Sequence, residues 1–107
     1  MFNKITIIGS GLIGSSLLRA INKKKLSKHI SVFDKSKDVI SFIEDKLSVK
    51  VCKSISESVE ESDLVIISTP LSSYKEILFS IKSKLKKNAI LTDTGSAKKE
   101  INKIISN

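Results

Sequence analysis

Short apolar runs alternate with helix-spaced segments along almost the whole chain, and this alternation restricts the fold more than any other feature. The apolar runs have strand length and are rich in Ile, Leu and Val; they are residues 4–8, 30–34, 49–52, 64–68 and 89–93. Between them, apolar residues recur every three or four positions, as on one face of a helix. We predict helices over residues 12–24, 39–47 and 71–85, one or two helical turns within 54–63, and a last helix from residue 97.

This order of elements predicts a parallel sheet with helices on both faces, because each helix carries the chain back to the end where the next strand begins. The run LVIIS (64–68) is the most apolar, so we expect its strand to be covered on both faces. A length of 107 residues with 40% apolar side chains is typical of one folded domain. We therefore predict a single α/β domain over residues 1–107, with a doubly wound parallel sheet in three layers, α/β/α.

Three of the four glycines lie in one loop, GSGLIG, which follows the first predicted strand and opens the first predicted helix. Asp34 ends the second predicted strand about 20 residues later, which is the spacing of a Rossmann-type dinucleotide-binding fingerprint. Gly9 would permit the tight turn, Gly11 the approach of the pyrophosphate, and Gly14 the packing of helix on strand. The helix N-terminus presents free N–H groups to the phosphates. We expect the following residues of the loop to bind the cofactor: Gly9, Ser10, Gly11, Leu12, Ile13 and Gly14.

The acid also predicts which cofactor is bound. Asp34 can accept hydrogen bonds from the ribose hydroxyls of the adenosine, and its charge repels a 2′-phosphate, so NAD is favoured over NADP. Lys35 and Lys37 follow directly and could weaken that repulsion, so NADP stays possible. We include Lys35 with Asp34 among the cofactor-binding residues.

Two more polar turns follow predicted strands, STP after the fourth and DTGS after the fifth. Ligands of open α/β sheets bind outside the carboxyl ends of the strands, where the strand order reverses, so both turns should border the cofactor groove. Capping of the next helix is an alternative role for the serine and threonine hydroxyls, and the two roles are compatible. The residues predicted to line the groove from these turns are Ser68, Thr69, Pro70, Thr94 and Gly95.

The charge of +8, from 19 basic and 11 acidic residues, could suggest nucleic acid as a partner. However, the basic residues are lysines spread over every segment, with Arg19 as the only arginine, and no aromatic residues interleave with a basic run. No run approaches the roughly 18 apolar residues of a membrane span. Cys52 has no second cysteine to pair with and suits a buried thiol in a reduced compartment. We predict a cytoplasmic protein with no nucleic-acid, membrane or metal partner.

Together, the segments ITIIGSGLIGSSLLRAI, VFD, SDLVIISTPLSSYKEIL and AILTDTGSAKKEI resemble the N-terminal domain of prephenate dehydrogenases, the prephenate and arogenate dehydrogenases of tyrosine biosynthesis. The DTGSAK stretch is similar to that family's D-x-G-S-x-K pattern. The resemblance implies NAD(P)-dependent oxidation of prephenate, with loss of CO₂, to 4-hydroxyphenylpyruvate. It implies that Ser96 is catalytic, lying near the nicotinamide and the substrate hydroxyl and hydrogen-bonding a catalytic histidine.

The chain departs from that family in what it lacks. The family's catalytic histidine, its substrate-binding arginines and its helical dimerisation domain are expected beyond residue 107. His29, the only histidine, starts the second predicted strand, at the end of the sheet opposite the groove. We expect the cofactor half of an enzyme, inactive alone. A stand-alone dinucleotide-binding regulatory module and another small NAD(P)-dependent dehydrogenase or reductase are the alternatives.

Overall fold

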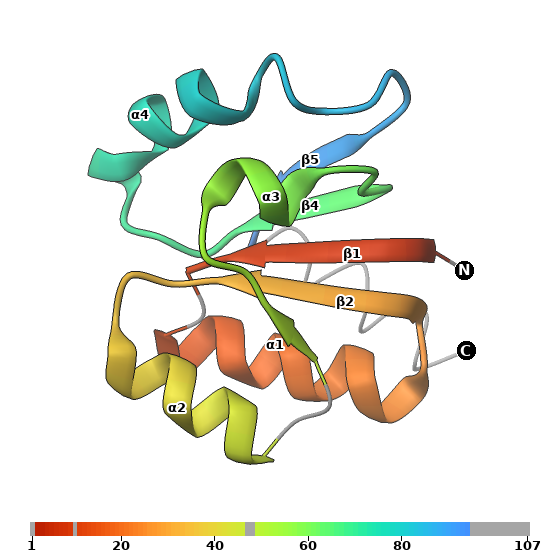
Figure 1. Cartoon of the computed structure of the whole chain (residues 1–107), viewed down its shortest axis with the longest axis vertical. Coiled ribbons are helices and arrows are strands. Elements are labelled where there is room, and N and C mark those ends of the chain that lie inside the picture. The colour runs from red at the N-terminus through yellow and green to blue at the C-terminus, as the bar shows by residue number, and fades with distance from the viewer. Residues whose placement is uncertain (1, 10, 47–48, 95–107) are drawn as a thin grey trace.

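The computed structural model describes residues 2–9, 11–46 and 49–94, in which strands and helices alternate (Figure 1). The strands are β1 (Phe2–Ile8), β2 (Ser27–Phe33), β3 (Lys50–Val51), β4 (Leu64–Ile67) and β5 (Ile90–Asp93). The helices are α1 (Gly11–Lys24), α2 (Lys37–Lys46), α3 (Ile55–Val59) and α4 (Leu71–Ile81). The helix predicted from residue 97 lies outside the described residues.

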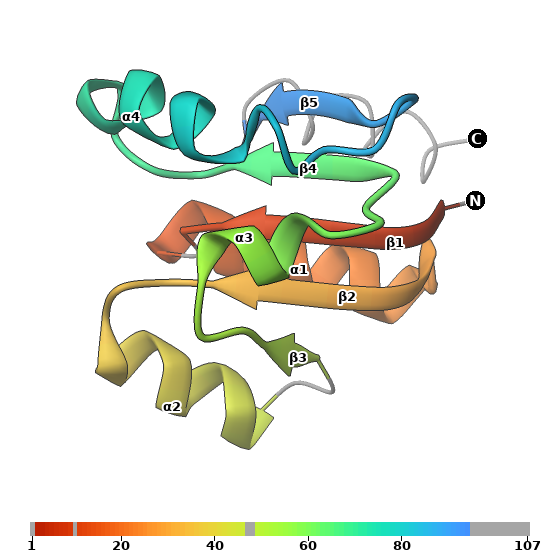
Figure 2. The same ribbon diagram turned by 45° about the horizontal axis from the view of Figure 1, so that its top comes forward.

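All five strands form one parallel sheet in the order β3-β2-β1-β4-β5. Figure 2 shows them in this order, with β5 at the top and β3 at the bottom. The strand order reverses at β1, which pairs with β2 on one side and with β4 on the other. The predicted doubly wound parallel sheet is confirmed, and the reversal places the carboxyl ends of β1 and β4 beside each other.

Successive side chains of a strand point to opposite faces of the sheet, so each face has its own core. Under α1 and α2, the fully or almost fully buried side chains include Ile5, Ile7, Leu17, Leu18, Ile21, Ile43 and Ile66. Under α3 and α4, they include Ile8, Val59, Val65, Ile67, Ile77 and Ile81. Strand β4 contributes to both clusters, which confirms that it is covered on both faces. The result is the predicted three-layer arrangement (Figure 1).

A small buried polar cluster lies within the second core. The Thr6 hydroxyl donates to the backbone carbonyl of Ser58 at 2.5 Å and lies 2.6 Å from the Ser62 hydroxyl. All three residues are fully buried. Because buried polar groups are costly without partners, these bonds hold α3 and the turn after it in one position on β1.

Asp63 joins three strands at the end of the sheet opposite the carboxyl ends of β1 and β4. Its carboxylate accepts hydrogen bonds from the backbone N–H groups of Asn3 and Lys4, at 2.6 and 3.2 Å, and from the Lys86 ammonium. Its backbone carbonyl accepts from the N–H of Ile90 at 2.8 Å, where β5 begins. The bond from Lys86, followed by that from Asn3, lowers the pKa of Asp63 below its ordinary value of 3.8.

The structure corrects one position of the apolar stripe predicted for the helix after Pro70. The apolar spacing predicts a stripe through Leu71, Tyr74, Leu78, Ile81 and Leu85. Leu78 is instead 37% exposed, and its neighbour Phe79 is 86% exposed. Ile81 is fully buried, as the stripe predicts, and Tyr74 and Leu85 pack against the second core cluster. Ile77, outside the predicted stripe, is buried in place of Leu78, because the helix is rotated so that the face between Ile77 and Ile81 meets the sheet. The helix also ends at Ile81 rather than at residue 85, and the predicted third strand, 49–52, is reduced to Lys50–Val51.

Candidate functional site

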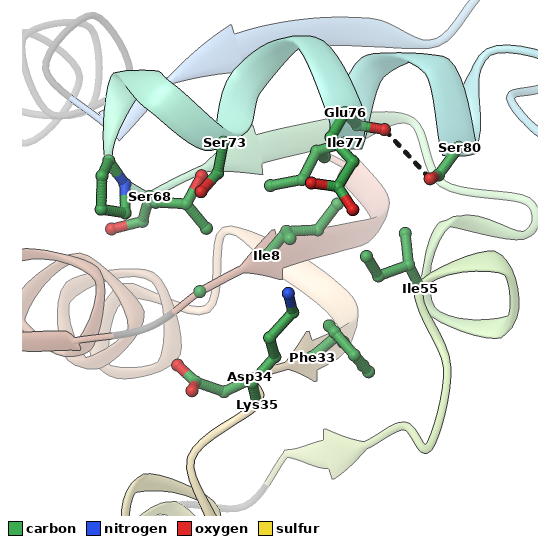
Figure 3. Close-up of a pocket in the computed structure, with 13 residues that line it drawn as sticks. Ile8, Phe33, Asp34, Lys35, Ile55, Ser68, Ser73, Glu76, Ile77 and Ser80 are labelled. Carbon is green, nitrogen blue, oxygen red and sulfur yellow. Dashed lines mark hydrogen bonds between the residues drawn. The ribbon is translucent and has the colours of Figure 1, made fainter.

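The carboxyl ends of β1, β2 and β4 are held together by backbone hydrogen bonds. The N–H of Gly9 donates to the Phe33 carbonyl at 2.7 Å, and the N–H of Ser68 donates to the Ile8 carbonyl at 2.8 Å. A pocket of about 380 Å³ opens beyond these strand ends and under α4 (Figure 3). The sequence predicted a groove at this place, and six of the predicted cofactor-binding residues line the pocket: Gly9, Asp34, Lys35, Ser68, Thr69 and Pro70.

Gly9 has a backbone conformation and a setting that suit only glycine. Its φ is +76°, a value that residues with a side chain rarely adopt. A Cβ atom there would also lie 2.5 Å from Cγ2 of Thr69 and 3.4 Å from the backbone of Ser68. The predicted role of Gly9 in the tight turn is therefore confirmed. Its lack of a side chain keeps the end of β1 open toward the pocket.

The turn after β4 supplies a polar group that the described residues do not satisfy. The Thr69 Oγ1 atom is buried and has no hydrogen-bond partner among those residues. It does not cap α4, since Pro70 occupies the N-cap position and no side chain donates or accepts there. The capping alternative thus fails for Thr69. A buried hydroxyl at the rim of a pocket, next to a glycine turn, suits a polar ligand.

Asp34 and Lys35 form the rim at the end of β2. Asp34 lies just after the strand rather than within it, and its Oδ1 atom accepts from the backbone N–H of Ser36 at 2.8 Å. This bond fixes the turn into α2. Figure 3 shows the Lys35 side chain extending into the pocket, whereas the Asp34 carboxylate points to one side of it. The rim therefore carries both charges that bear on the choice between NAD and NADP.

Helices α3 and α4 add pocket residues that the sequence did not predict, namely Ile55, Ser73, Glu76, Ile77 and Ser80, together with Ile8 and Phe33 from the strand ends. The α4 residues recur at intervals of three and four, so they share one face of the helix. That spacing is present in the sequence. The more apolar stripe through Tyr74 and Leu78 obscures it, because periodicity alone favours the more apolar face as the buried one.

The turn after β5 begins outside the pocket lining. Thr94 is 7% exposed, and its hydroxyl donates to the Ile67 carbonyl at 3.1 Å. The Tyr74 hydroxyl donates to the same carbonyl at 3.2 Å, and burial, with the nearby charge of Asp93, raises the pKa of Tyr74. Thr94 thus holds β5 to β4, and its role toward a cofactor stays a prediction.

Other predicted site residues are described only in part or not at all. Residues 11–14 form the first turn of α1, beginning at Gly11 directly after the strand edge of the pocket, so the helix N-terminus is where the fingerprint requires it. This turn contains Gly11, Leu12, Ile13 and Gly14. Three predicted residues, Ser10, Gly95 and Ser96, lie outside the described residues.

His29 is exposed in the amino-terminal half of β2, away from the pocket, as expected. Within residues 2–9, 11–46 and 49–94, no group of three or more His, Cys, Asp or Glu side chains could hold a metal ion. No helix among the same residues is long and apolar enough to cross a membrane. Cys52 is a free, buried thiol.

The family described as "NADP oxidoreductase coenzyme F420-dependent" matches residues 4–96. The chain belongs to this family. The match includes β1 from residue 4 onward, the glycine loop, the pocket and β5, and it ends at the DTGS turn.

Sequence relatives confirm the resemblance to prephenate dehydrogenases. A cyclohexadienyl dehydrogenase from Zymomonas mobilis is 34% identical over 110 residues, which cover 98% of this chain and 36% of the relative. A prephenate dehydrogenase from Lactococcus lactis is 34% identical over 100 residues, covering 92% and 28%. The chain therefore spans about a third of the length of these relatives.

A solved structure confirms the fold. Prephenate dehydrogenase from A. aeolicus, in complex with hydroxyphenyl propionate and NAD+, superimposes with a TM-score of 0.77 at 23% identity. The superposition covers 87% of this chain and 33% of that one. The arrangement of strands and helices around the pocket is thus shared with a dinucleotide-dependent enzyme of known structure.

Proposed function

We propose that this chain is the cofactor-binding domain of an NAD-dependent prephenate dehydrogenase. The observation that carries the proposal is the pocket at the reversal of the sheet, bounded by the glycine turn at Gly9 and by Asp34. Two 34% identical relatives named cyclohexadienyl and prephenate dehydrogenase support the assignment. The A. aeolicus enzyme, whose structure contains NAD+, supports the choice of cofactor.

The residues present fit a dinucleotide. The absence of a Cβ at Gly9 leaves space that a side chain would fill, and the buried Thr69 hydroxyl could bond to a polar group of the ligand. The N-terminus of α1 would hold the pyrophosphate, and Asp34 would accept hydrogen bonds from the adenosine ribose. When bound, NAD supplies the acceptor for the hydride that leaves the substrate. The work of this chain is to bind and orient that acceptor.

We propose that the whole protein oxidises and decarboxylates prephenate to 4-hydroxyphenylpyruvate, or arogenate to tyrosine. Ser96 would help to orient the substrate hydroxyl and a catalytic histidine. That histidine, the substrate-binding arginines and a helical dimerisation domain would come from residues that this chain does not contain. The enzyme would act in the cytoplasm, as a homodimer, on a small-molecule substrate, and this chain alone would not turn it over.

NADP is the second candidate cofactor, and one observation favours it. The Lys35 side chain extends into the pocket next to Asp34, where a cation would attract a 2′-phosphate (Figure 3). The family's description also names NADP. The balance between the Asp34 carboxylate and the Lys35 ammonium therefore decides the preference between NAD and NADP. We expect the carboxylate to prevail, because Asp34 lies at the ribose-binding position of the fingerprint.

Calorimetric titration of the 107-residue chain with NAD+ and with NADP+ tests the proposal. We expect saturable binding of NAD+ that is tighter than that of NADP+. Asp34→Asn keeps an acceptor for the Ser36 N–H but removes the charge, so the preference for NAD+ should fall about tenfold. Asp38→Asn, an exposed carboxylate on α2, is the matched control and should leave the preference unchanged. The absence of saturable binding of either dinucleotide up to millimolar concentration would refute the proposed function.

A further inference from the structure

The pocket has two chemically different regions. In the turns just after the strands it is polar, with the Gly9 turn, Asp34 and the Thr69 hydroxyl. On the side that faces α3 and α4, its walls are apolar and come from four side chains, Ile8 and Phe33 at the last positions of β1 and β2, and Ile55 and Ile77 on the two helices (Figure 3). These walls are an aromatic ring and branched aliphatic groups, and all four belong to or pack against the second core cluster. A flat, mostly apolar ligand group suits such walls.

Helix α4 borders this apolar region with a polar rim. Ser73, Glu76 and Ser80 share the helix face that lines it, and Figure 3 shows the Glu76 carboxylate pointing into the pocket. The Ser80 hydroxyl donates to the Glu76 backbone carbonyl at 3.0 Å, so its proton is used within the helix. An ionised carboxylate only accepts hydrogen bonds. The ligand group that lies here must therefore bring a donor.

The charge of Glu76 also favours one end of a dinucleotide over the other against α4. A carboxylate repels phosphate groups, whereas the N-terminus of α1, which begins two residues after Gly9, attracts them. An uncharged aromatic ring with an N–H donor satisfies both the apolar walls and the carboxylate. Adenine is such a ring, because its exocyclic amine carries two N–H donors.

We propose that the apolar region of the pocket holds the adenine ring and that Glu76 selects it by accepting a hydrogen bond from the exocyclic amine. The inference rests on the proposed dinucleotide-binding function and adds to it a residue that determines specificity for the base. A ring that carries an oxygen at the position of the amine places two acceptors against each other. Such a dinucleotide should bind more weakly, by about tenfold for a hydrogen bond to the charged, exposed side chain of Glu76.

The test compares three dinucleotides that differ only in the purine: NAD+, nicotinamide hypoxanthine dinucleotide and nicotinamide guanine dinucleotide. Their dissociation constants are measured by calorimetry on the 107-residue chain. The wild-type chain should bind NAD+ about tenfold more tightly than the hypoxanthine form. In Glu76→Gln, the amide can donate to the ring oxygen, so this ratio should fall to near one. Glu60→Gln, an exposed carboxylate outside the pocket, is the control and should keep the wild-type ratio.

The outcomes separate the two proposals. An unchanged ratio in Glu76→Gln, no discrimination by the wild-type chain, or tightest binding of the guanine form would each overturn the role of Glu76 while leaving dinucleotide binding intact. A lack of binding of all three dinucleotides would overturn both. A fall of the ratio in Glu76→Gln but not in Glu60→Gln would support the assignment.

Discussion

Gly9→Ala tests whether the turn at the end of β1 requires glycine for the two reasons that the structure gives. The first reason is the backbone, since φ is +76° and a non-glycine residue in this left-handed region costs about 1–2 kcal/mol. The second is contact, because the new Cβ would lie 2.5 Å from Cγ2 of Thr69. Rotation of the Thr69 side chain can relieve some of that contact, so we assign it the lower end of the overpacking range, about 1 kcal/mol. Alanine also restricts the unfolded chain, which offsets about 0.4–1 kcal/mol.

The expected net loss in the free energy of unfolding is about 2 kcal/mol. Urea denaturation followed by far-ultraviolet circular dichroism measures it. Thr69→Ser removes Cγ2 but keeps the hydroxyl, so the double variant G9A/T69S should be less destabilised than the two single variants predict together. The coupling between the two positions should be about 1 kcal/mol. The cost of placing alanine in the left-handed backbone conformation should remain in the double variant.

Two results would show the reasoning to be wrong. A loss below about 0.5 kcal/mol in Gly9→Ala would contradict the argument from φ. A coupling near zero would contradict the argument from contact with Thr69. Calorimetry adds a second check, because a side chain at position 9 fills space at the pocket edge and should weaken NAD+ binding in Gly9→Ala.

Three further predictions concern stability and use the same denaturation assay. The pKa of Asp63 is lowered mainly by its bond from Lys86. The contribution of this carboxylate to the stability of the fold is therefore complete above the ordinary value of 3.8 and is lost as pH falls through the lowered value. Between about pH 5 and about pH 2 the wild-type chain should lose more stability than Asp63→Asn. Ile81→Ala, at a fully buried position, should lower the free energy of unfolding by about 3 kcal/mol. Phe79→Ala, at a position 86% exposed on the same helix, should change it by less than about 0.5 kcal/mol. Similar losses of stability in the two variants would contradict the assigned helix rotation. Thr6→Val leaves the Ser58 carbonyl without the donor that Thr6 provides and should cost about 2 kcal/mol, and a neutral result would contradict a structural role for that buried bond.

The sequence by itself determined the features that depend on neighbouring residues. The order of strands and helices follows from periodicity, and the glycine turn and Asp34 follow from their place directly after two strands. In parallel sheets with helical crossovers the carboxyl ends of the strands meet at one edge, so these local signals were enough to predict the groove. Its position is confirmed by the pocket that Gly9, Asp34 and Thr69 line.

Only the tertiary structure decided which face of each element meets the groove. The apolar pattern of α4 predicted an inner face with Leu78 beside Ile81. Docking on the sheet buried Ile81 but selected Ile77 in place of Leu78, a rotation that turned Glu76 into the pocket. Thr94 was itself predicted to line the groove, yet its hydroxyl donates to the Ile67 carbonyl. Helix rotation and side-chain direction depend on the packing of segments far apart in the chain. Periodicity specifies a face only to within one residue, or about 100° of helix rotation.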